Sequence, residues 1–171
     1  EKVLDVATGT ADLAIAMAKR TNAEVTGCDI SDGMLEIGKK KVIHERLENR
    51  IILENGDAEN LHYSDNTFDV VSIAFGIRNF ENTTKGLREI HRVLKPDGKL
   101  IILEFSKPET WGIRHLYNFY FKLICPLAGR IISGDRNAYT YLFNSVQVFP
   151  YGQDFIELLS NAGFKNNTCK P

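Results

Sequence analysis

Near its beginning the chain reads Val3-Leu4-Asp5-Val6-Ala7-Thr8-Gly9-Thr10-Ala11-Asp12. The apolar run Val3–Ala7 predicts a buried strand, and the pattern of Asp12–Arg20 predicts a helix. At the carboxyl end of the first strand of an α/β sheet, a turn of small residues lets a ligand approach the backbone. The helix that follows offers unpaired N–H groups. The stretch therefore indicates either a nucleotide-binding turn or a tight connection that binds nothing.

Strand and helix patterns alternate as far as residue 105. The expected strands are Val3–Ala7, Glu24–Ile30, Arg50–Glu54, Phe68–Phe75 and Lys99–Phe105. The expected helices are Asp12–Arg20, a helix from Asp32 to about Leu47 with Ser31 as its N-cap, and Thr83–Leu94, which the breaker Lys95-Pro96-Asp97-Gly98 ends. The continuous apolar run of the fourth strand is typical of parallel sheets. This order predicts an α/β fold with a doubly wound, mostly parallel sheet and right-handed crossovers.

The alternation stops between residues 106 and 151. This stretch holds ten of the 17 aromatic residues, namely Trp111, Tyr117, Phe119, Tyr120, Phe121, Tyr139, Tyr141, Phe143, Phe149 and Tyr151. We expect a helical, aromatic-rich insertion at 106–151, followed by a last helix over Asp154–Ala162 and a strand that begins near Phe164. We interpret residues 1–171 as a single domain. Because the chain opens inside a strand pattern, we also expect it to be truncated at both ends.

Composition excludes several classes of protein. The 171 residues carry 21 Lys and Arg against 22 Asp and Glu, a net charge of −1, and nucleic-acid binders usually have a basic excess. Cys28, Cys125 and Cys169 form neither a zinc-binding spacing nor a disulfide framework, so we expect no metal site and a reducing, cytoplasmic location. No apolar run approaches the roughly 18 residues that a membrane-spanning helix needs.

Two acidic residues extend the argument for a nucleotide. Asp29 ends the second strand, twenty residues after Gly9, where a carboxylate can accept both hydroxyls of a ribose. Gly56-Asp57-Ala58 follows the third strand, where a carboxylate can take an adenine amino group. Either acid, taken alone, is equally explained as a helix cap or a solvated turn residue. The small-residue turn after the first strand, Asp29 and Asp57 are expected at the same edge of one sheet, and together they favour a nucleoside cofactor.

The cofactor is either NAD or S-adenosylmethionine (SAM). A dinucleotide site requires G-x-G-x-x-G, whereas this turn lacks a third glycine, and no second nucleotide-binding half follows the fourth strand. The turn resembles instead the D/E-x-G-x-G-x-G motif of the class I, Rossmann-like SAM-dependent methyltransferases, with Ala7 and Ala11 in place of two glycines. Ala11 is expected to narrow the space beneath the methionine part of SAM.

Later motifs sharpen the resemblance. Phe68-Asp69-Val70-Val71-Ser72-Ile73-Ala74-Phe75-Gly76-Ile77-Arg78-Asn79 is similar to a signature of the ubiquinone/menaquinone biosynthesis C-methyltransferases. Three further segments resemble the same family: Leu87–Pro96, Leu103-Glu104-Phe105-Ser106-Lys107-Pro108, and the spacing from Gly134 to Pro150. The chain is identified from them as a member of this family over essentially its whole length.

The resemblance implies a set of cofactor residues. They are Asp5, Gly9, Thr10, Asp29, Asp57, Ala58 and Ala74. Some family members have a serine where this chain has Ala74, so the contact of that hydroxyl is either absent here or made by the backbone. The family also has a longer N-terminal helical segment that helps to cover the cofactor, which implies that this chain binds SAM weakly.

The reaction that the resemblance implies is methylation of a ring carbon in a demethylated polyprenyl quinol. Such a carbon is a good nucleophile when the neighbouring phenol is ionised, and an ordinary phenol has a pKa near about 10. A fixed positive charge favours the phenolate, and Arg78 is the candidate for it, with Asn79 to orient an oxygen. The alternative role for Arg78 is a pair with a surface carboxylate. Weaker candidates for proton transfer are His115, Tyr117, Asp135 and Tyr139.

Demethylmenaquinol is the preferred substrate, and the ubiquinol precursor is the second. From Lys107 to Arg136 five Lys or Arg and two Asp or Glu are interleaved with bulky apolar residues, a mixture suited to an anionic membrane surface that presents a polyprenyl tail. The alternative is that these aromatic residues pack against an N-terminal segment or a second subunit. Three other functions stay open: methylation of another lipophilic small molecule, an NAD-dependent oxidoreductase, and a non-catalytic SAM-binding or membrane-docking module.

Overall fold

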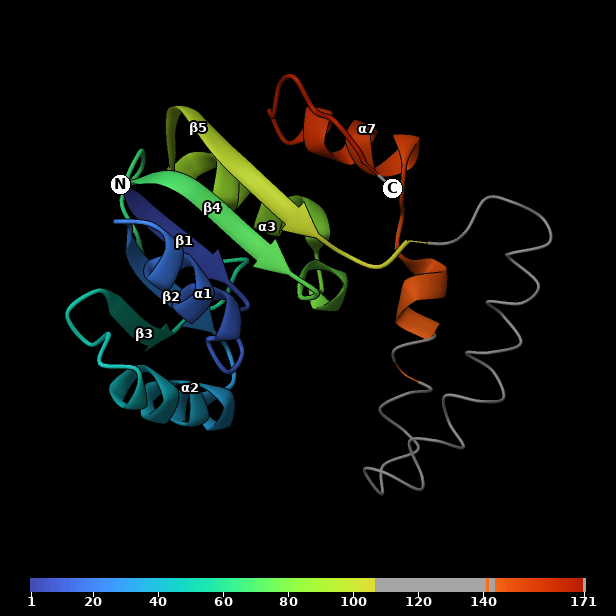
Figure 1. Cartoon of the computed structure of the whole chain (residues 1–171). Helices are drawn as coiled ribbons and strands as arrows, with labels where there is room; N and C mark the ends of the chain where they lie inside the picture. The colour runs from blue at the N-terminus through green and yellow to red at the C-terminus, as the bar shows by residue number, and fades with distance from the viewer. Residues whose placement is uncertain (107–140, 142–143, 171) are drawn as a thin grey trace. The chain divides into compact units, whose positions relative to one another are not determined.

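The computed structural model describes residues 1–106, 141 and 144–170. Its centre is a parallel sheet of five strands in the order β3-β2-β1-β4-β5 (Figure 1). The strands are β1 (Lys2–Val6), β2 (Glu24–Asp29), β3 (Ile51–Asn55), β4 (Phe68–Ala74) and β5 (Leu94–Leu103). The helices are α1 (Asp12–Arg20), α2 (Asp32–His44), the short 3-10 helix η1 (Ile77–Asn79), α3 (Thr83–Val93) and α7 (Gln153–Asn161). The doubly wound α/β fold expected from the sequence is confirmed.

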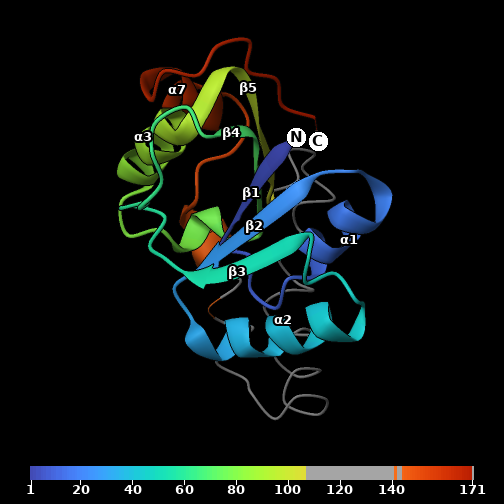
Figure 2. The same ribbon diagram turned by 90° about the vertical axis from the view of Figure 1, so that its left-hand side faces the viewer.

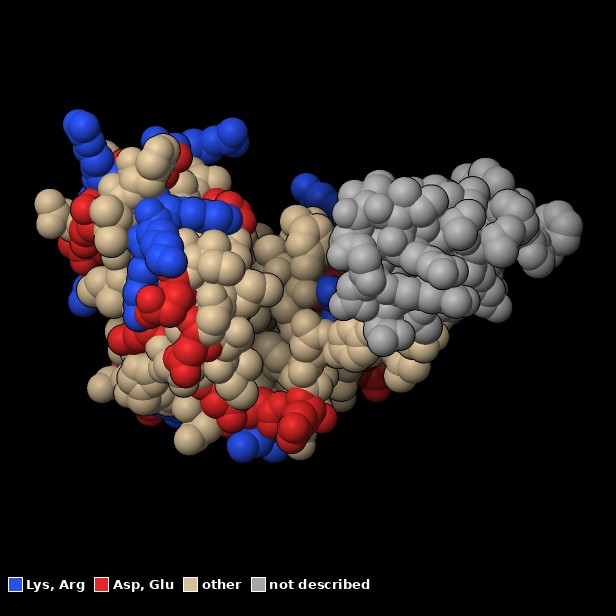
Figure 3. Space-filling view, turned by 90° about the horizontal axis from the view of Figure 1, so that it is seen from below, with Lys and Arg blue, Asp and Glu red and all other residues tan. Residues whose placement is uncertain are grey.

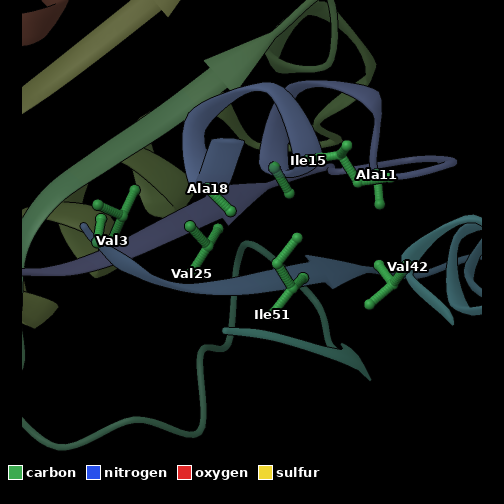
Figure 4. Close-up of a cluster of buried hydrophobic side chains, with 9 residues drawn as sticks. Val3, Ala11, Ile15, Ala18, Val25, Val42 and Ile51 are labelled. Carbon is green, nitrogen blue, oxygen red and sulfur yellow. The ribbon is translucent and has the colours of Figure 1, made fainter. Parts of the chain in front are cut away.

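The sheet carries helices on both faces. Val3, Val25 and Ile51 come from three neighbouring strands and share one buried cluster with residues of α1 and α2. Figure 4 shows these side chains converging between the sheet and the two helices. Figure 2 shows α3 on the side of the sheet opposite to α1, and α3 buries Leu87 and Ile90 completely. Because the chain crosses from β3 to β4 past β1, the order of the strands reverses between β1 and β4.

Most expected elements have the predicted bounds within a few residues, and two do not. The helix α1 coincides with the prediction, and Ser31 caps α2 by accepting a hydrogen bond from the Met34 N–H at 3.4 Å. The strand β5 starts at Leu94 rather than Lys99, because Leu94 already pairs with Phe68. The next pair joins Val70 to Lys99, so the four turn residues form an irregularity within β5. The prediction of a strand that begins near Phe164 was wrong, because the described residues 164–170 form no strand.

The chain divides into two compact units. Unit 1 comprises residues Glu1–Glu104 and Leu158–Asn166, and unit 2 comprises Phe105–Glu157 and Asn167–Pro171. In unit 1 the ring of Phe164 stands edge-on to His91 with centroids 5.1 Å apart, which ties the segment after α7 to α3. In unit 2 the described residues 144–148 are helical, and the rings of Phe149 and Phe155 lie 5.3 Å apart. The rest of the expected aromatic insertion lies outside the described residues.

Surface charge is mixed over the described part of the face shown in Figure 3, where basic and acidic side chains lie side by side. This distribution accords with the near-balanced total of charged residues. None of the helices that the structure describes has the length and apolar character needed to cross a membrane.

Candidate functional site

The predicted cofactor residues meet at the carboxyl edge of the sheet. Backbone hydrogen bonds link the turns that follow β1, β2 and β3: the Thr8 N–H donates to the Cys28 carbonyl at 3.1 Å, and the Gly56 N–H donates to the Asp29 carbonyl at 3.1 Å. Since all five strands are parallel, these turns lie at one edge, next to the point where the strand order reverses. The turns after β1, β2 and β3 are therefore connected to one another through their backbones.

The turn after β1 is wound in an unusual conformation. Ala7, Gly9 and Ala11 all have positive φ angles, of 55°, 57° and 64°. For alanine this left-handed conformation costs roughly 1–2 kcal/mol, which glycine would avoid. The Ala11 methyl group is fully buried and faces Gly38 of α2, so it fills the protein core. The expectation that Ala11 narrows the space beneath a ligand was therefore wrong.

Asp5, a buried residue of β1, stabilises this turn through hydrogen bonds. It is only 1% exposed, and its carboxylate accepts hydrogen bonds from the hydroxyl groups of Thr8 at 2.7 Å and Ser72 at 2.6 Å. Burial raises the pKa of Asp5, and the nearby charge of Asp29 raises it further. The structure thus places Asp5 inside the sheet, where it fixes the turn and does not reach the surface.

Asp29 holds the two sides of the edge together. One of its carboxylate oxygens, Oδ2, accepts the Gly9 N–H at 2.8 Å, and the other, Oδ1, accepts the Ser31 N–H at 2.9 Å. Each carboxylate oxygen can accept a second hydrogen bond. Asp29 is therefore oriented by the protein, with acceptor capacity for two further hydroxyl groups.

Asp57 and Ala58 lie in a short loop after β3. Asp57 accepts the Glu59 N–H at 2.8 Å through Oδ1, and its backbone pairs with Asn60 in an isolated bridge.

Ile30, directly after Asp29, has a side chain that is 74% exposed although it is large and apolar. Sequence reasoning missed Ile30, because an isoleucine after a strand looks like one more core residue.

A second layer supports the loop after β3. The hydroxyl of Tyr63 donates to Oε1 of Glu54 at 2.5 Å, and Tyr63 and Cys28 influence each other's pKa. Burial raises the pKa of Cys28 to about 12, so this thiol is protonated at neutral pH. A Cβ on Gly56 would lie 2.6 Å from the Cys28 sulfur, which explains the glycine at this position. Cys28 therefore packs beneath the loop.

Thr10 is engaged by a lysine from the next helix. Lys41 of α2 donates to the Thr10 hydroxyl at 2.8 Å and to both carboxylate oxygens of Asp12 at 2.8 Å. The Thr10 hydroxyl itself donates to Asp12 at 2.7 Å. The hydrogen bond from Lys41 is the main cause of the lowered pKa of Asp12. Lys41 thus ties the turn after β1 to α2, a role that sequence reasoning missed.

The edge continues at the end of β4. Ala74 pairs with Leu103 of β5, and Phe75 follows with a φ of 58°, a strained conformation for an aromatic residue. A Cβ on Gly76 would lie 2.4 Å from the Ala7 Cβ. The missing side chain at Gly76 therefore makes room for Ala7.

Arg78 and Asn79 belong to η1, immediately after this turn. Arg78 donates from Nη1 to the carbonyl of Phe75 and to the Glu104 carboxylate, the latter at 2.7 Å. The side chains of Arg78 and Glu104 are only 11% and 7% exposed. Arg78 therefore does pair with a carboxylate, as the alternative held, but the pair is largely buried.

The remaining predicted groups lie elsewhere. His115, Tyr117, Asp135 and Tyr139 fall outside the described residues. Within the part of the chain that the structure describes, no group of His, Cys, Asp and Glu is arranged to hold a metal ion.

Known proteins share both the sequence and the fold. A model of the ubiE/COQ5 methyltransferase family matches residues 1–170. The chain is 40% identical over 165 residues to a demethylmenaquinone methyltransferase of Bacteroides fragilis, covering 96% of this chain and 67% of the relative. It is 43% identical over 167 residues to the ubiquinone/menaquinone biosynthesis C-methyltransferase UbiE of Geotalea daltonii, covering 96% and 71% of the two chains.

A solved structure agrees with these relatives. A SAM-dependent methyltransferase from Aquifex aeolicus superimposes with a TM-score of 0.58 at 27% identity, covering 64% of this chain and 59% of that one. The five parallel strands, the turn after β1 and the acid that ends β2 are thus set in the fold of the SAM-dependent methyltransferases. Since the family model spans nearly every residue, the chain belongs to the ubiE/COQ5 methyltransferase family.

Proposed function

We propose that this protein is a SAM-dependent C-methyltransferase that methylates a ring carbon of a demethylated polyprenyl quinol. Demethylmenaquinol is the preferred substrate, and the ubiquinol precursor is the second. The observation that carries the proposal is the placement of Asp29, whose carboxylate is bonded to Gly9 of the first turn beside the reversal of the strand order. Family membership and the names of the two relatives supply the reaction class.

The residues at the edge fit SAM. A Cβ built on Gly9 has no neighbour within 4 Å, so a ligand can approach that backbone closely. Asp29 suits the ribose hydroxyls, the exposed Ile30 offers an apolar surface to the flat adenine ring, and the loop of Asp57 and Ala58 offers polar groups to the edge of that ring. Thr10 and Ala74 lie at the ends of β1 and β4, where the methionine part would reach.

The chain must make a ring carbon nucleophilic. SAM supplies an electrophilic methyl group when it is bound. The guanidinium of Arg78, at the end of β4, favours the ionised form of a quinol hydroxyl beside it, because a fixed positive charge stabilises a phenolate. Asn79 orients an oxygen of the ring. Holding the ring carbon in line with the methyl group then removes much of the entropic cost of the transfer.

The balance of atoms is simple. The new bond joins the methyl carbon to the ring carbon while the bond from that methyl to the sulfonium sulfur breaks, so that S-adenosylhomocysteine is the leaving group. The ring carbon loses its proton and the quinol hydroxyl regains the one that it gave up, so one proton is released overall. No oxidant or reductant is needed, which separates this reaction from that of the NAD-dependent oxidoreductase considered from sequence. The turn after β1 lacks the glycine pattern of a dinucleotide site, and this also favours SAM.

The experiment is a methyl-transfer assay with SAM that carries a deuterated methyl group. The substrates are demethylmenaquinol, the ubiquinol precursor, and a simple phenol and a sterol as controls. We expect a product with the labelled methyl group on the ring carbon of a quinol, and Arg78→Ala should lose turnover while keeping its affinity for SAM. Methylation of the phenol or sterol alone would replace the proposed substrate. An Arg78→Ala protein with undiminished turnover would remove Arg78 from the mechanism.

We also propose that residues 1–171 form one domain with a substrate-side insertion at 106–151.

We propose further that the protein meets its substrate at the surface of a membrane. The basic and aromatic residues between Lys107 and Arg136 support membrane binding. Flotation with anionic liposomes should carry the protein upward, and absence of co-flotation would contradict surface binding. Light scattering of the same sample tests the alternative that this stretch packs in a homo-oligomer.

A further inference from the structure

A pair of opposite charges joins the ends of β4 and β5. Arg78 lies in η1 after β4, and Glu104 directly follows the last residue of β5. The two residues are 26 positions apart, and Arg78 Nη1 lies 2.7 Å from Glu104 Oε1. Both side chains are close to fully buried. This pair is therefore placed at the same carboxyl edge as Asp29 and the turn after β1.

The surroundings of Arg78 fix its direction. Its Nη1 also donates to the carbonyl of Phe75, a residue with a left-handed backbone conformation. A guanidinium is planar and presents its N–H groups as a rigid fork, so two acceptors on one nitrogen restrict the orientation of the whole group. An arginine held in this way loses little further side-chain freedom when a substrate arrives.

We infer that Glu104 is a positioning residue for methyl transfer, which acts by holding the Arg78 guanidinium beside the site of the quinol hydroxyl. The inference rests on the proposed function, in which Arg78 stabilises the phenolate. A preorganised charge is effective because it costs no reorganisation during the reaction. Glu104 also balances the charge of Arg78 before substrate binds, and an unbalanced buried charge would destabilise the fold.

An ion pair that only stabilised the fold would respond differently to the removal of Glu104. If Glu104 only stabilised the fold, its removal would lower the unfolding midpoint and leave the turnover of the folded protein unchanged. If Glu104 acts through Arg78, its removal lowers kcat, has little effect on SAM affinity, and matters only while Arg78 is present. A double-mutant cycle on the two residues distinguishes these cases.

The chain provides a matched control. Asp69 of β4 and Lys95 of β5 form a second ion pair between the same two strands, with 2.6 Å between Oδ1 and Nζ. This pair lies at the amino ends of the strands, away from the edge where the candidate site lies. Asp69→Asn removes one charge from it as Glu104→Gln does from the other pair.

The experiment measures kcat with demethylmenaquinol, the Kd for SAM and the unfolding midpoint for the wild type, Glu104→Gln, Glu104→Asp, Arg78→Ala, the Arg78→Ala/Glu104→Gln double variant and Asp69→Asn. We expect Glu104→Gln to lower kcat by at least about tenfold, since small displacements of a catalytic group are costly. SAM affinity should stay within about twofold. In the Arg78→Ala background the Glu104→Gln change should lower kcat by less than about twofold. Asp69→Asn should match the wild type in kcat.

Three results would overturn the inference. The first is an unchanged kcat in Glu104→Gln. The second is the same loss from Glu104→Gln with and without Arg78. The third is a loss in Asp69→Asn as large as that in Glu104→Gln. If Glu104→Gln does not fold, Glu104→Asp keeps the charge on a shorter side chain, and a wild-type kcat in that variant would count equally against the inference. A wild-type protein that binds SAM but does not methylate the quinol overturns the proposed function itself, and the role of Glu104 with it.

Discussion

Lys41 shows how a single residue outside the cofactor motif can shape the motif. Its ammonium group bonds to Thr10 and Asp12 and so ties the turn after β1 to α2. We predict that Lys41→Met weakens SAM binding by up to about fivefold, because partly exposed ion pairs contribute at most about 1 kcal/mol. Lys39→Met removes the exposed pair of Lys39 with Glu36 on the same helix and should leave the affinity unchanged. Calorimetric titration of both variants checks this, and equal affinities would contradict it.

Asp5 makes stability depend on pH. Burial raises its pKa above the usual 3.8, so the folded state holds a proton more tightly at this site than the unfolded state does. This contribution stabilises the fold at low pH and is lost as the pH rises through the raised pKa. The variant Asp5→Asn, which can keep hydrogen bonds to Thr8 and Ser72, lacks this dependence.

We therefore predict that Asp5→Asn gains stability relative to the wild type as the pH is raised from the ordinary carboxyl pKa of 3.8 to neutrality. Urea denaturation of both proteins across this range measures the free energy of unfolding at each pH. A difference in unfolding free energy that stays constant over the range, or that favours the wild type more at high pH, would mean that the carboxylate is well accommodated in its ionised form.

At the scale of secondary-structure elements, the segments that follow β1 and β4 pack closely, with the Ala7 methyl group against Gly76. Gly76 has a φ of −108°, which any residue can adopt, so only the contact with Ala7 excludes a side chain there. We predict that Gly76→Ala costs about 1–3 kcal/mol of stability, as overpacking does. Ala7→Gly in the same chain should restore most of this loss, since it removes the opposing methyl and relieves the positive φ of Ala7.

Denaturation of the two single variants and the double variant tests this coupling. Ala7→Gly alone should be stabilising by roughly 1 kcal/mol. If Gly76→Ala is as unstable in the Ala7→Gly background as in the wild type, then the contact between the two residues is not what requires the glycine.

The helix caps differ in strength. Asn82 accepts the Lys85 N–H at 3.0 Å at the start of α3, while Ser31 accepts the Met34 N–H at 3.4 Å at the start of α2. We predict that Asn82→Ala costs about 1 kcal/mol, a typical value for an N-cap, and that Ser31→Ala costs less. Thermal unfolding of the two variants gives the order, and a larger loss for Ser31→Ala would contradict it.

Local patterns predicted the elements well and the contacts between them poorly. The helix over Asp12–Arg20 followed from its apolar spacing, and Asp29 followed from its place at the end of a strand. The start of β5 did not, because the pairing of Leu94 with Phe68 overrides a turn signal that is strong in isolation. The glycine at position 76 has no local explanation, because the methyl group that excludes a side chain there belongs to Ala7, far away in the sequence.

For the candidate site the same division holds. The positions of Asp29, Asp57 and Gly9 at one edge of the sheet could be predicted because each ends or follows a strand. Lys41 and Glu104 were missed as partners, because nothing local in the sequence indicates that Lys41 reaches Thr10 or that Glu104 reaches Arg78. Their roles depend on the order of the strands, which brings together residues that are 31 and 26 positions apart.

At the scale of the whole molecule, the parallel order of the strands gathers five strand ends at one edge, where the proposed site lies. The turn after β1 supplies a close approach, β2 and β3 supply acids, and β4 and β5 supply the pair of charges. The family to which the chain belongs accords with this arrangement. The central claim is therefore that the edge binds SAM through Asp29.

The most direct test is a calorimetric titration of the protein with SAM and with its demethylated product, S-adenosylhomocysteine, using NADH as the control ligand. We expect saturable binding of both sulfur nucleosides, none of NADH, and a marked loss of affinity in Asp29→Ala. The variant Asp32→Ala, which changes an exposed acid in the next turn, should retain the affinity. Binding of NADH without binding of SAM, or an Asp29→Ala protein with undiminished affinity for SAM, would contradict the account.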